Sequence, residues 1–225
     1  SVDHPMCRDL QKNKDFIKFK EQCLKVGTTE EALANAEKNG YKTNFNAKHP
    51  FIKEKKITNE KELMDYYGYN GALGNFRMKI KFLRSWILHT IAYSSPHSGL
   101  TAKIQRSRGV NIGKNCHFSP YVLLDLVYPH LVKIGDNVTF GSNVMVYAHN
   151  NPAANLFLKN GAFPRKVQEV NIKSGAVLFP GVIVTAGVTI GENSIISVGS
   201  VVTHDIPDYC VVVGNPGRVI KKIDH

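Results

Sequence analysis

Apolar residues recur at every sixth position through the second half of the chain. Counted from Ile112, the pattern holds through three runs that are separated by two gaps. The twelve positions are Ile112, Phe118, Leu124, Ile134, Phe140, Val146, Ile172, Leu178, Val184, Ile190, Ile196 and Val202. Because hydrophobic residues make up only 43% of the chain, twelve apolar positions out of twelve are poorly explained by chance. Glycine often follows the apolar residue directly, as at Gly135 and Gly191.

A period of six residues predicts one short strand and one turn in each repeat. Three repeats close a triangular coil, and stacked coils bury the apolar positions in a central column. The pattern therefore predicts a mainly β protein, a left-handed parallel β-helix of about four coils with an N-terminal α-helical extension. This handedness is opposite to that of most crossovers, so the repeat alone carries the prediction. The coils are expected to begin at Ile112, Ile134, Ile172 and Ile190.

Two insertions interrupt the repeat, and both follow the third apolar position of a coil. Leu124 to Ile134 spans 10 residues, and Val146 to Ile172 spans 26. The chain is therefore expected to leave the prism twice at the same corner, and insertions gathered on one face of a solenoid often mark its working face. The loop at 150–169 is too apolar to be free, so we expect it to pack on a neighbouring subunit and to wall an acceptor pocket.

The first 108 residues are predicted to be largely helical and hold most of the positive charge. They carry 20 basic and 11 acidic residues, which supply +9 of the net charge of +11. Helices are expected over 9–26, 28–40, 59–67 and 74–93, and Asn59 with Glu62 has the spacing of a capping box. The expected domains are a helical appendage and linker at 1–57, a helical segment packed on the β-helix at 58–103, and the β-helix at 104–225.

The helix expected at 74–93 has an apolar stripe beside basic residues. The stripe consists of Phe76, Ile80, Leu83, Ile87 and Ile91. Helices that bind membrane surfaces or nucleic acids have this pattern. A helix that packs its stripe on its own domain and leaves a basic face in solvent is commoner, and we expect that arrangement here.

Several classes of protein are not expected. No apolar stretch is long enough for a membrane span, and the N-terminal residues contain no apolar signal core. The four cysteines are far apart and form no C-x-x-C pair, which argues against a disulfide framework or a thiolate zinc site. We therefore expect a cytoplasmic protein that binds neither a membrane nor a nucleic acid.

Three segments resemble the hexapeptide-repeat O-acetyltransferases, most nearly the maltose/galactoside and xenobiotic branches. They are IGDNVTFGSNVMVYAHN, VTIGENSIISVGSVVTHDIP and VVVGNPGRVIKKI, and the resemblance covers about residues 104–223. It implies an acyltransferase that moves an acetyl group from acetyl-CoA to a hydroxyl, without a required metal. It also implies a homotrimer with acetyl-CoA in the groove between subunits. Separately, the first 40 or so residues loosely resemble leader peptides of the nitrogen-fixation type.

His149 is the expected catalytic residue. It stands three residues past Val146, where the long insertion leaves, and Pro152 follows as in the family pattern. Acetyl transfer to an alcohol needs a general base, and a neutral imidazole has a suitable pKa. Asp125 lies at the same corner one coil earlier, so it should open onto the same cleft. The resemblance implies an acceptor-binding role for Asp125, and Ser119 stands where the galactoside branch has asparagine; Tyr147 and Asn150 are further candidates for lining the site.

The resemblance also implies residues for coenzyme A. They are Val198 and Gly199 along the pantetheine, Thr203 and His204 in the V-V-T-H-D segment, and Arg218 and Lys221 at the phosphates. Basic side chains suit a 3′-phosphate and a pyrophosphate. The family has lysine at the position of His204, and this departure puts one phosphate contact in doubt.

Other functions remain open on the sequence. A non-catalytic recognition module built on a β-helix is one alternative. A γ-type carbonic anhydrase is another, although His117, His130 and His204 occupy other corners or coil ends than the three zinc histidines it needs. The acceptor is open among sugars, antibiotic-like molecules and peptide side chains, because a fold does not fix a substrate.

Overall fold

The computed structural model describes residues 59–155, 159 and 163–224, which belong to the second of two compact units, residues 56–225. The helices expected at 9–26 and 28–40, and the leader-peptide resemblance, lie outside the described residues. So do Leu156, Phe157 and Leu158 of the apolar loop.

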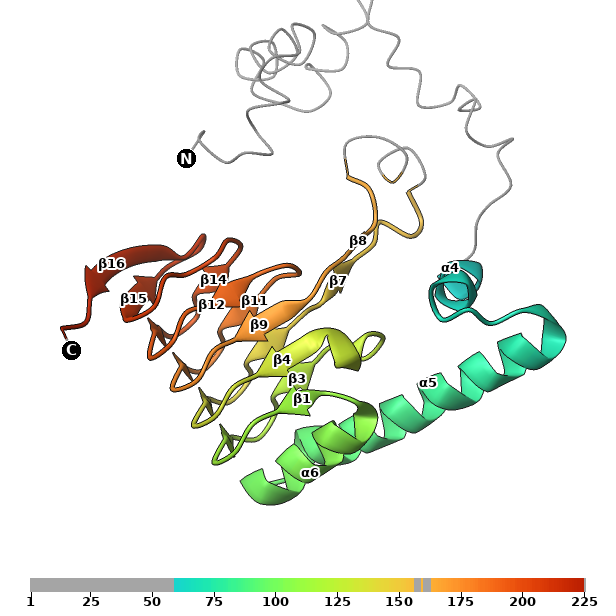
Figure 1. The fold of residues 1–225 in the computed structure, drawn as a ribbon, viewed down its shortest axis with the longest axis horizontal. Coiled ribbons are helices and arrows are strands. Elements are labelled where there is room, and N and C mark those ends of the chain that lie inside the picture. Colours follow the sequence, from blue (N-terminus) through green and yellow to red (C-terminus); the bar gives the residue numbers. More distant parts are fainter. Residues whose placement is uncertain (1–58, 156–158, 160–162, 225) are drawn as a thin grey trace, which may run out of the picture. The chain divides into compact units, whose positions relative to one another are not determined.

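Three sheets form the sides of a prism, and their strands are parallel except for the last strand of sheet B (Figure 1). Sheet A contains β1 (Asn111–Ile112), β4 (Val132–Ile134), β9 (Val170–Ile172) and β12 (Thr189–Ile190). Sheet B contains β2 (His117–Phe118), β5 (Thr139–Phe140), β10 (Val177–Leu178), β13 (Ile195–Ile196), β15 (Cys210–Val213) and β16 (Arg218–Lys222). Sheet C contains β3 (Leu123–Leu124), β6 (Met145–Val146), β11 (Ile183–Val184) and β14 (Val201–Val202). The left-handed parallel β-helix of four coils is thereby confirmed.

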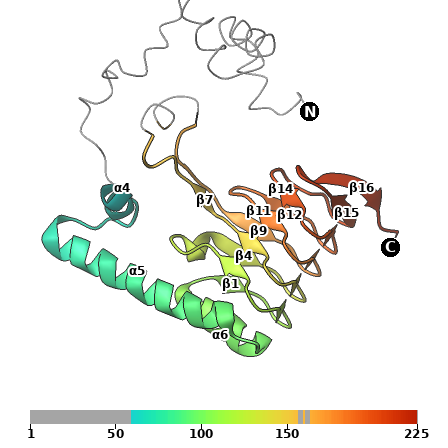
Figure 2. The ribbon, with the colours of Figure 1, turned by 180° about the vertical axis from the view of Figure 1, so that it is seen from behind.

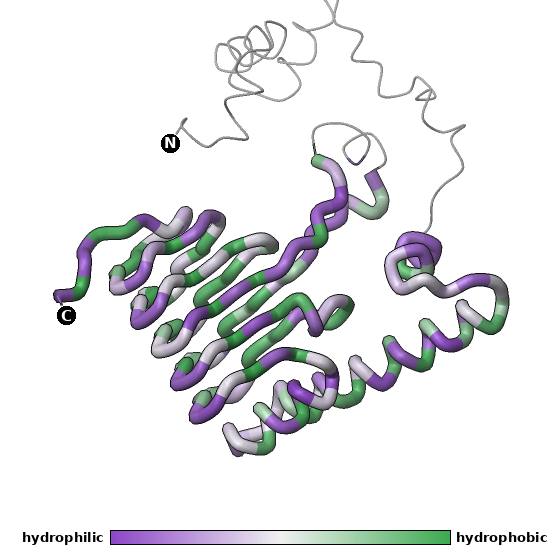
Figure 3. The backbone as a smooth tube through the Cα atoms, in the orientation of Figure 1, coloured by the Kyte–Doolittle hydropathy of each residue, from purple (hydrophilic) through white to green (hydrophobic). Residues whose placement is uncertain are grey.

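The predicted apolar positions form the core of this prism. In register, Ile112 pairs with Ile134, Ile134 with Ile172, and Ile172 with Ile190, so identical positions of successive coils stack. All twelve predicted residues are buried, the most exposed being Ile112 at 7%. In the prism, the two-residue strands bury the second residue more deeply than the first. Hydrophobic and hydrophilic stretches succeed one another along the coils (Figure 3).

The glycines that follow the apolar positions are explained by the close approach of stacked coils. A Cβ atom on Gly191 would lie 2.3 Å from the backbone carbon of Pro207. A Cβ atom on Gly141 would lie 2.5 Å from the backbone nitrogen of Pro180. Both distances are far shorter than a van der Waals contact, so only glycine fits at these corners without moving the next coil.

Both insertions are structured at their ends. The shorter one contains the 3₁₀ turn η2 (Pro129–Leu131). The longer one leaves and returns as an antiparallel pair, β7 (His149–Asn150) and β8 (Lys166–Val167), in which His149 pairs with Val167. They depart from the same corner, after β3 and after β6, as predicted.

Three helices precede the β-helix: α4 (Asn59–Tyr66), α5 (Gly71–Ser94) and α6 (Ser98–Arg108). α6 was not predicted, and the domain boundary expected after residue 103 falls inside it. It packs against the first coil (Figure 2). There the Phe118 amide donates to Ser98 Oγ at 2.8 Å. Gly109, with φ of 105°, ends the helix in the left-handed conformation.

The outer face of α5 differs from the expectation. Its buried residues are Gly74, Met78, His89 and Ala92, which form the side toward the rest of the unit. Phe76, Ile80, Leu83, Ile87 and Ile91 are all exposed. The expectation that this stripe packs on its own domain is therefore wrong. Among the residues that the structure describes, no helix has the length and apolar character needed to span a bilayer.

Candidate active site

The corner where both insertions leave is the candidate site. The residues that follow sheet C stack there, because the amide of Asp125 donates to the Val146 carbonyl and the amide of Tyr147 donates to the Val184 carbonyl. This continuous ladder brings one coil's Asp125 beside the next coil's insertion. The sequence predicted that juxtaposition from the positions of the two insertions.

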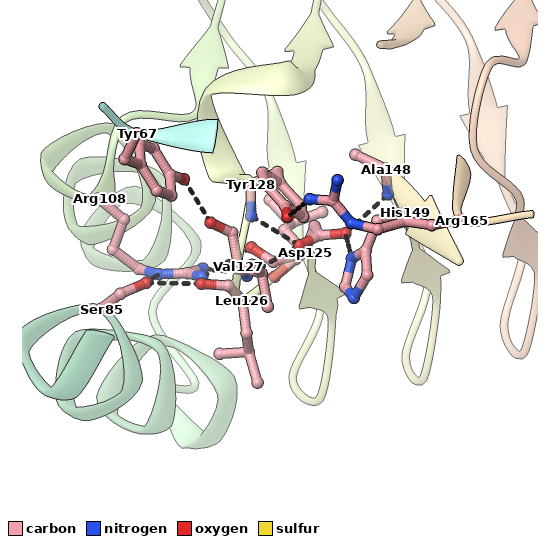
Figure 4. Close-up of polar contacts among 11 residues, drawn as sticks. Tyr67, Ser85, Arg108, Asp125, Leu126, Val127, Tyr128, Ala148, His149 and Arg165 are labelled. Atoms are coloured by element: carbon pink, nitrogen blue, oxygen red, sulfur yellow. Dashed lines mark hydrogen bonds and ion pairs between the residues drawn. The ribbon is translucent and has the colours of Figure 1, made fainter. Parts of the chain in front are cut away.

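Asp125 and His149 form a close pair (Figure 4). His149 Nδ1 lies 2.6 Å from Asp125 Oδ2, while the Asp125 side chain is fully buried and that of His149 is 28% exposed. Three backbone amides also donate to the carboxylate: Val127 and Tyr128 to Oδ1, and Ala148 to Oδ2, each at 2.8 Å. The carboxylate is thus held rigidly, and it holds one edge of the imidazole in turn.

Hydrogen bonding keeps Asp125 ionised. Burial by itself raises the pKa of this carboxyl. The hydrogen bonds from His149 and from the amides of Tyr128 and Ala148 outweigh burial, so the pKa of Asp125 lies below its ordinary value. An ionised carboxylate only accepts hydrogen bonds, so Nδ1 of His149 must carry a proton. In the neutral ring, Nε2 is then unprotonated and is able to accept one.

The contacts of Asp125 suggest a further role beside the acceptor binding expected for it, which stays a prediction. The sequence reasoning assigned it to the acceptor, by resemblance. Its carboxylate oxygens are occupied by four donors, and the residue is only 1% exposed. Its contacts are those of a residue that orients His149.

A buried polar network supports the segment behind Asp125. Arg108, at the end of α6, donates to the Asp125 carbonyl at 2.8 Å and to Ser85 Oγ of α5 at 3.2 Å (Figure 4). Its guanidinium also contacts Gln105 Oε1 and lies 3.0 Å from His89 Nδ1. Burial lowers the pKa of Arg108 to about 10, which leaves it charged at neutral pH. Burial and the adjacent guanidinium lower the pKa of His89 to about 4, which keeps that ring neutral.

Aromatic and charged residues surround the pair on its other side. The Tyr128 ring packs edge-on against His149, with 5.2 Å between centroids, and its hydroxyl accepts from Arg165 of the long loop. Glu62 of α4 pairs with Lys159 and accepts from Asn151 Nδ2 at 3.0 Å. The described part of the loop therefore contacts α4 of the same chain; packing on a neighbouring subunit stays a prediction.

The other expected acceptor residues are divided between two corners. Tyr147 is half-buried in the same corner column as Asp125, and Asn150 is exposed beside His149 on β7. Ser119 follows β2 and lies at the corner between sheets B and C, one side of the prism away from His149. Their contact with an acceptor stays a prediction.

The residues expected to bind coenzyme A gather in two places. Val198 and Gly199 are exposed at the corner between sheets B and C. The turn at 214–217, just before Arg218, lies beside this corner. Two hydrogen bonds hold it there: the Gly217 amide donates to the Val201 carbonyl at 2.8 Å, and the Gly214 amide donates to Ser200 Oγ at 3.0 Å. Lys221 is also exposed, on β16.

Thr203 and His204 lie apart from that group. They follow β14 and occupy the same corner column as Asp125, three coils further along the prism. His117 and His130 are on sheet B and in η2, and within the described ranges no three His, Cys, Asp or Glu residues are arranged to hold a metal ion.

Sequence reasoning missed Arg108, Tyr128, Arg165 and Glu62. Tyr128 had a usable signal, because it lies in the four-residue insertion that already marked this corner. No sequence signal pointed to Arg108, Arg165 or Glu62. Each belongs to a helix or a loop outside the six-residue repeat, so the repeat could not predict its position.

Comparison with known proteins agrees with this architecture, although no model of a known protein family matches the chain. The galactoside O-acetyltransferase of Escherichia coli (strain K12) is 31% identical over 183 residues, 80% of this chain and 74% of that protein. The galactoside O-acetyltransferase of Lactococcus lactis is 40% identical over 116 residues, 50% of this chain and 55% of that protein. The chain thus spans little more than half of the Lactococcus relative.

A solved galactoside acetyltransferase in complex with coenzyme A superposes with a TM-score of 0.51 and 27% sequence identity, over 65% of this chain and 82% of that one. The repeat, the fold and the relatives together lead to one conclusion: this chain belongs to the hexapeptide-repeat acetyltransferase family.

Proposed function

We propose that the protein is an acyl-CoA-dependent O-acetyltransferase in which His149 is the general base. The observation that carries this proposal is the 2.6 Å contact between His149 Nδ1 and the buried, ionised Asp125. It leaves the opposite nitrogen of a partly exposed ring ready to accept a proton. The family membership supplies the reaction class, and the two galactoside O-acetyltransferases among the relatives favour a sugar-like acceptor.

The proton balance follows from this tautomer. Nε2 of His149 takes the proton of the acceptor hydroxyl as its oxygen bonds to the acetyl carbon of the thioester. The imidazolium then formed lies against Asp125, whose negative charge stabilises it. When the carbon–sulfur bond breaks, the same Nε2 returns the proton to the departing thiolate. The side chains end in the state in which they began.

The acetyl thioester is the chemistry that acetyl-CoA supplies, and this chain offers groups suited to its phosphates. Arg218, Lys221 and Lys222 are exposed on β16, with Val198 and Gly199 nearby. Exposed cations beside an uncharged corner fit a ligand with a phosphorylated end and an extended neutral arm. His204 replaces a family lysine, so these β16 cations carry more of the proposed phosphate binding.

A homotrimer is part of the proposal and rests on the outward faces of the prism. Sheet A presents polar residues outward: Asn111, Lys133, Asn171 and Thr189. Sheets B and C present mostly apolar ones: Val177, Ile195, Val211, Leu123, Met145, Ile183 and Val201. Two apolar sides that share an edge suit packing between subunits around a threefold axis. We place the active enzyme in the cytoplasm.

The test is release of coenzyme A from acetyl-CoA in the presence of a panel of sugar and other hydroxyl acceptors. His149→Ala should lower turnover by about 10²–10⁴-fold, since that is the usual contribution of a general base. Binding of acetyl-CoA, measured by calorimetry, should stay within about twofold. The matched control is His97→Ala, an exposed histidine between α5 and α6. Turnover that is unchanged in His149→Ala would refute the assignment.

A further inference from the structure

The outer face of α5 is a continuous apolar surface. Six residues on it, which we call the α5 stripe, are between 45% and 62% exposed. They are Leu73, Phe76, Ile80, Leu83, Ile87 and Ile91. Their spacing of three or four residues puts them on one side of the helix, opposite the buried Met78 and His89. An apolar face of this length is unusual on a protein surface and indicates a binding role.

Positive charge flanks the stripe, with no negative charge on α5 itself. At 100° per residue, Arg77 and Arg84 lie along one edge of the stripe and Lys79 along the other. Lys79 lies 3.8 Å from the exposed Glu60 carboxylate of α4, so the positive charge is strongest along the Arg77 and Arg84 edge. Residues 66–124, which include all of α5 and α6, contain eight Lys and Arg residues and no Asp or Glu. A ligand for this face must therefore be apolar at its centre and negative around it.

The apolar surface extends sideways from the stripe. Trp86, the single tryptophan of the chain, is 52% exposed beside Leu83. Together they border a hollow between α4 and α5 that Leu63, Met78 and Phe82 also line, with the charged pair Glu60 and Lys79 at its side. Tryptophan and long basic side chains are the residues that anchor a helix at the boundary between lipid headgroups and acyl chains.

We propose that α5 docks on an anionic lipid surface, lying in its plane. The stripe enters the boundary between headgroups and acyl chains, and Arg77, Lys79 and Arg84 reach the lipid phosphates on either side. This departs from the expectation, made on the sequence, that the protein binds no membrane. It is independent of the proposed acetyl transfer, because no residue of the stripe contacts Asp125 or His149.

Charge distinguishes this partner from two others. In a symmetric contact between two α5 helices, the cations of both copies would face one another with no carboxylate on either helix. A nucleic acid matches the cations, but the broad apolar centre of the face would gain nothing from phosphates or from groove edges. An anionic bilayer matches both features at once.

The first test is co-sedimentation of the full chain with vesicles. Vesicles of phosphatidylcholine with about one-third phosphatidylserine should bind the protein at least tenfold more tightly than phosphatidylcholine alone. Ile80→Ser with Leu83→Ser should weaken that binding by tenfold or more, since both apolar anchors are lost. Arg77→Gln with Lys79→Gln should weaken it by about fivefold per charge removed.

Matched controls lie at the other end of the chain. Ile220→Ser removes an exposed apolar residue, and Lys222→Gln removes an exposed cation. Both should bind the anionic vesicles like the unchanged protein. All substituted residues are exposed, so each variant should keep the circular dichroism and thermal midpoint of the parent. Binding that ignores the stripe substitutions, or that falls equally in the controls, would overturn the proposal.

Trp86 provides a second, spectroscopic readout. Its emission should shift to shorter wavelength on addition of the anionic vesicles, and not on addition of duplex DNA. A shift with DNA, persisting after Ile80→Ser and Leu83→Ser, would identify a nucleic-acid face instead. Mass measurement in solution decides the remaining case. If the same two substitutions lower the oligomeric mass, the stripe is a contact between copies and the lipid proposal fails.

Discussion

The interior of the β-helix and the outer face of α5 use the same kinds of apolar side chain in regular spacing, with opposite results. The twelve residues of the prism column are 7% exposed or less, while the six of the α5 stripe are 45% exposed or more. A repeat of six closes on itself, so each coil covers the residues of the next. A helical stripe has no such partner within its own element. Regular apolar spacing therefore predicts that a surface packs against something. Which part of the molecule or which partner covers it depends on the topology of the fold.

A single substitution made in both regions tests this comparison most directly. Leu178→Ala, in a fully buried position, should lower the free energy of unfolding by about 2–5 kcal/mol, through lost transfer energy and a residual cavity. Leu83→Ala, at 54% exposure, should change it by no more than about 0.5 kcal/mol. Chemical denaturation of both variants provides the measurement. Equal losses would mean that the two faces are buried alike in solution.

The next largest effect is expected at the corner of the β-helix. Asp125→Asn leaves one oxygen and one NH₂ group, so either His149 and the Ala148 amide or the amides of Val127 and Tyr128 lose their acceptor and face a donor. Turnover should fall by roughly 100-fold or more. Steady-state kinetics with a fixed acceptor give the value. Asp65→Asn, an exposed carboxylate on α4, is the control and should act like the parent. A loss below tenfold would remove the orienting role.

Arg108 links the two regions, and its removal should affect both stability and turnover. Arg108→Met keeps apolar bulk but leaves Gln105 Oε1 and the carbonyls of Leu124 and Asp125 without their donor. The expected cost is about 1–3 kcal/mol of unfolding free energy. Because the Asp125 backbone is released, turnover should fall while the affinity for acetyl-CoA holds. Unchanged turnover in a destabilised variant would limit Arg108 to a structural role.

The smallest expected effect is a pH dependence from His89. Burial and Arg108 lower the pKa of His89 from 6.5 to about 4 in the folded protein, so the unfolded chain binds the proton more readily. The contribution of His89 to the free energy of unfolding is therefore fully present above pH 6.5. It decreases as the pH drops from 6.5 toward 4. Denaturation at intervals across this range should show a shallower fall in His89→Gln. Parallel curves for parent and variant would contradict the assignment.

The β-helix was largely predictable because its determinants are local and repeated. The six-residue period predicts which residues are buried, where glycine follows them and how many coils form. The positions of the two insertions predict the corner that carries His149. The orientation of the Asp125 carboxylate was not predictable, because it depends on amides from two coils. Neither was α6: SGLTAKIQRSR has no long apolar stripe, and it is held by Ser98, Gln105 and Arg108 against partners distant in sequence. The exposure of the α5 stripe needed the fold, since sequence cannot tell which neighbours a face lacks.

Both ends of the stacked coils are closed, and this limits how the protein associates. At the start, α6 covers β1 and β2. At the finish, Ile206 bridges to Ile190, the segment around Gly214–Gly217 pairs with Val201, and β16 reverses direction beside β15. The outermost strand then carries Arg218, Lys221 and Lys222, charges that discourage another strand from adding. An open prism of this type is a template on which further molecules stack end to end into fibres. With both ends occupied, growth along the coil axis is blocked, and only the sides of the prism and the outer face of α5 remain for partners.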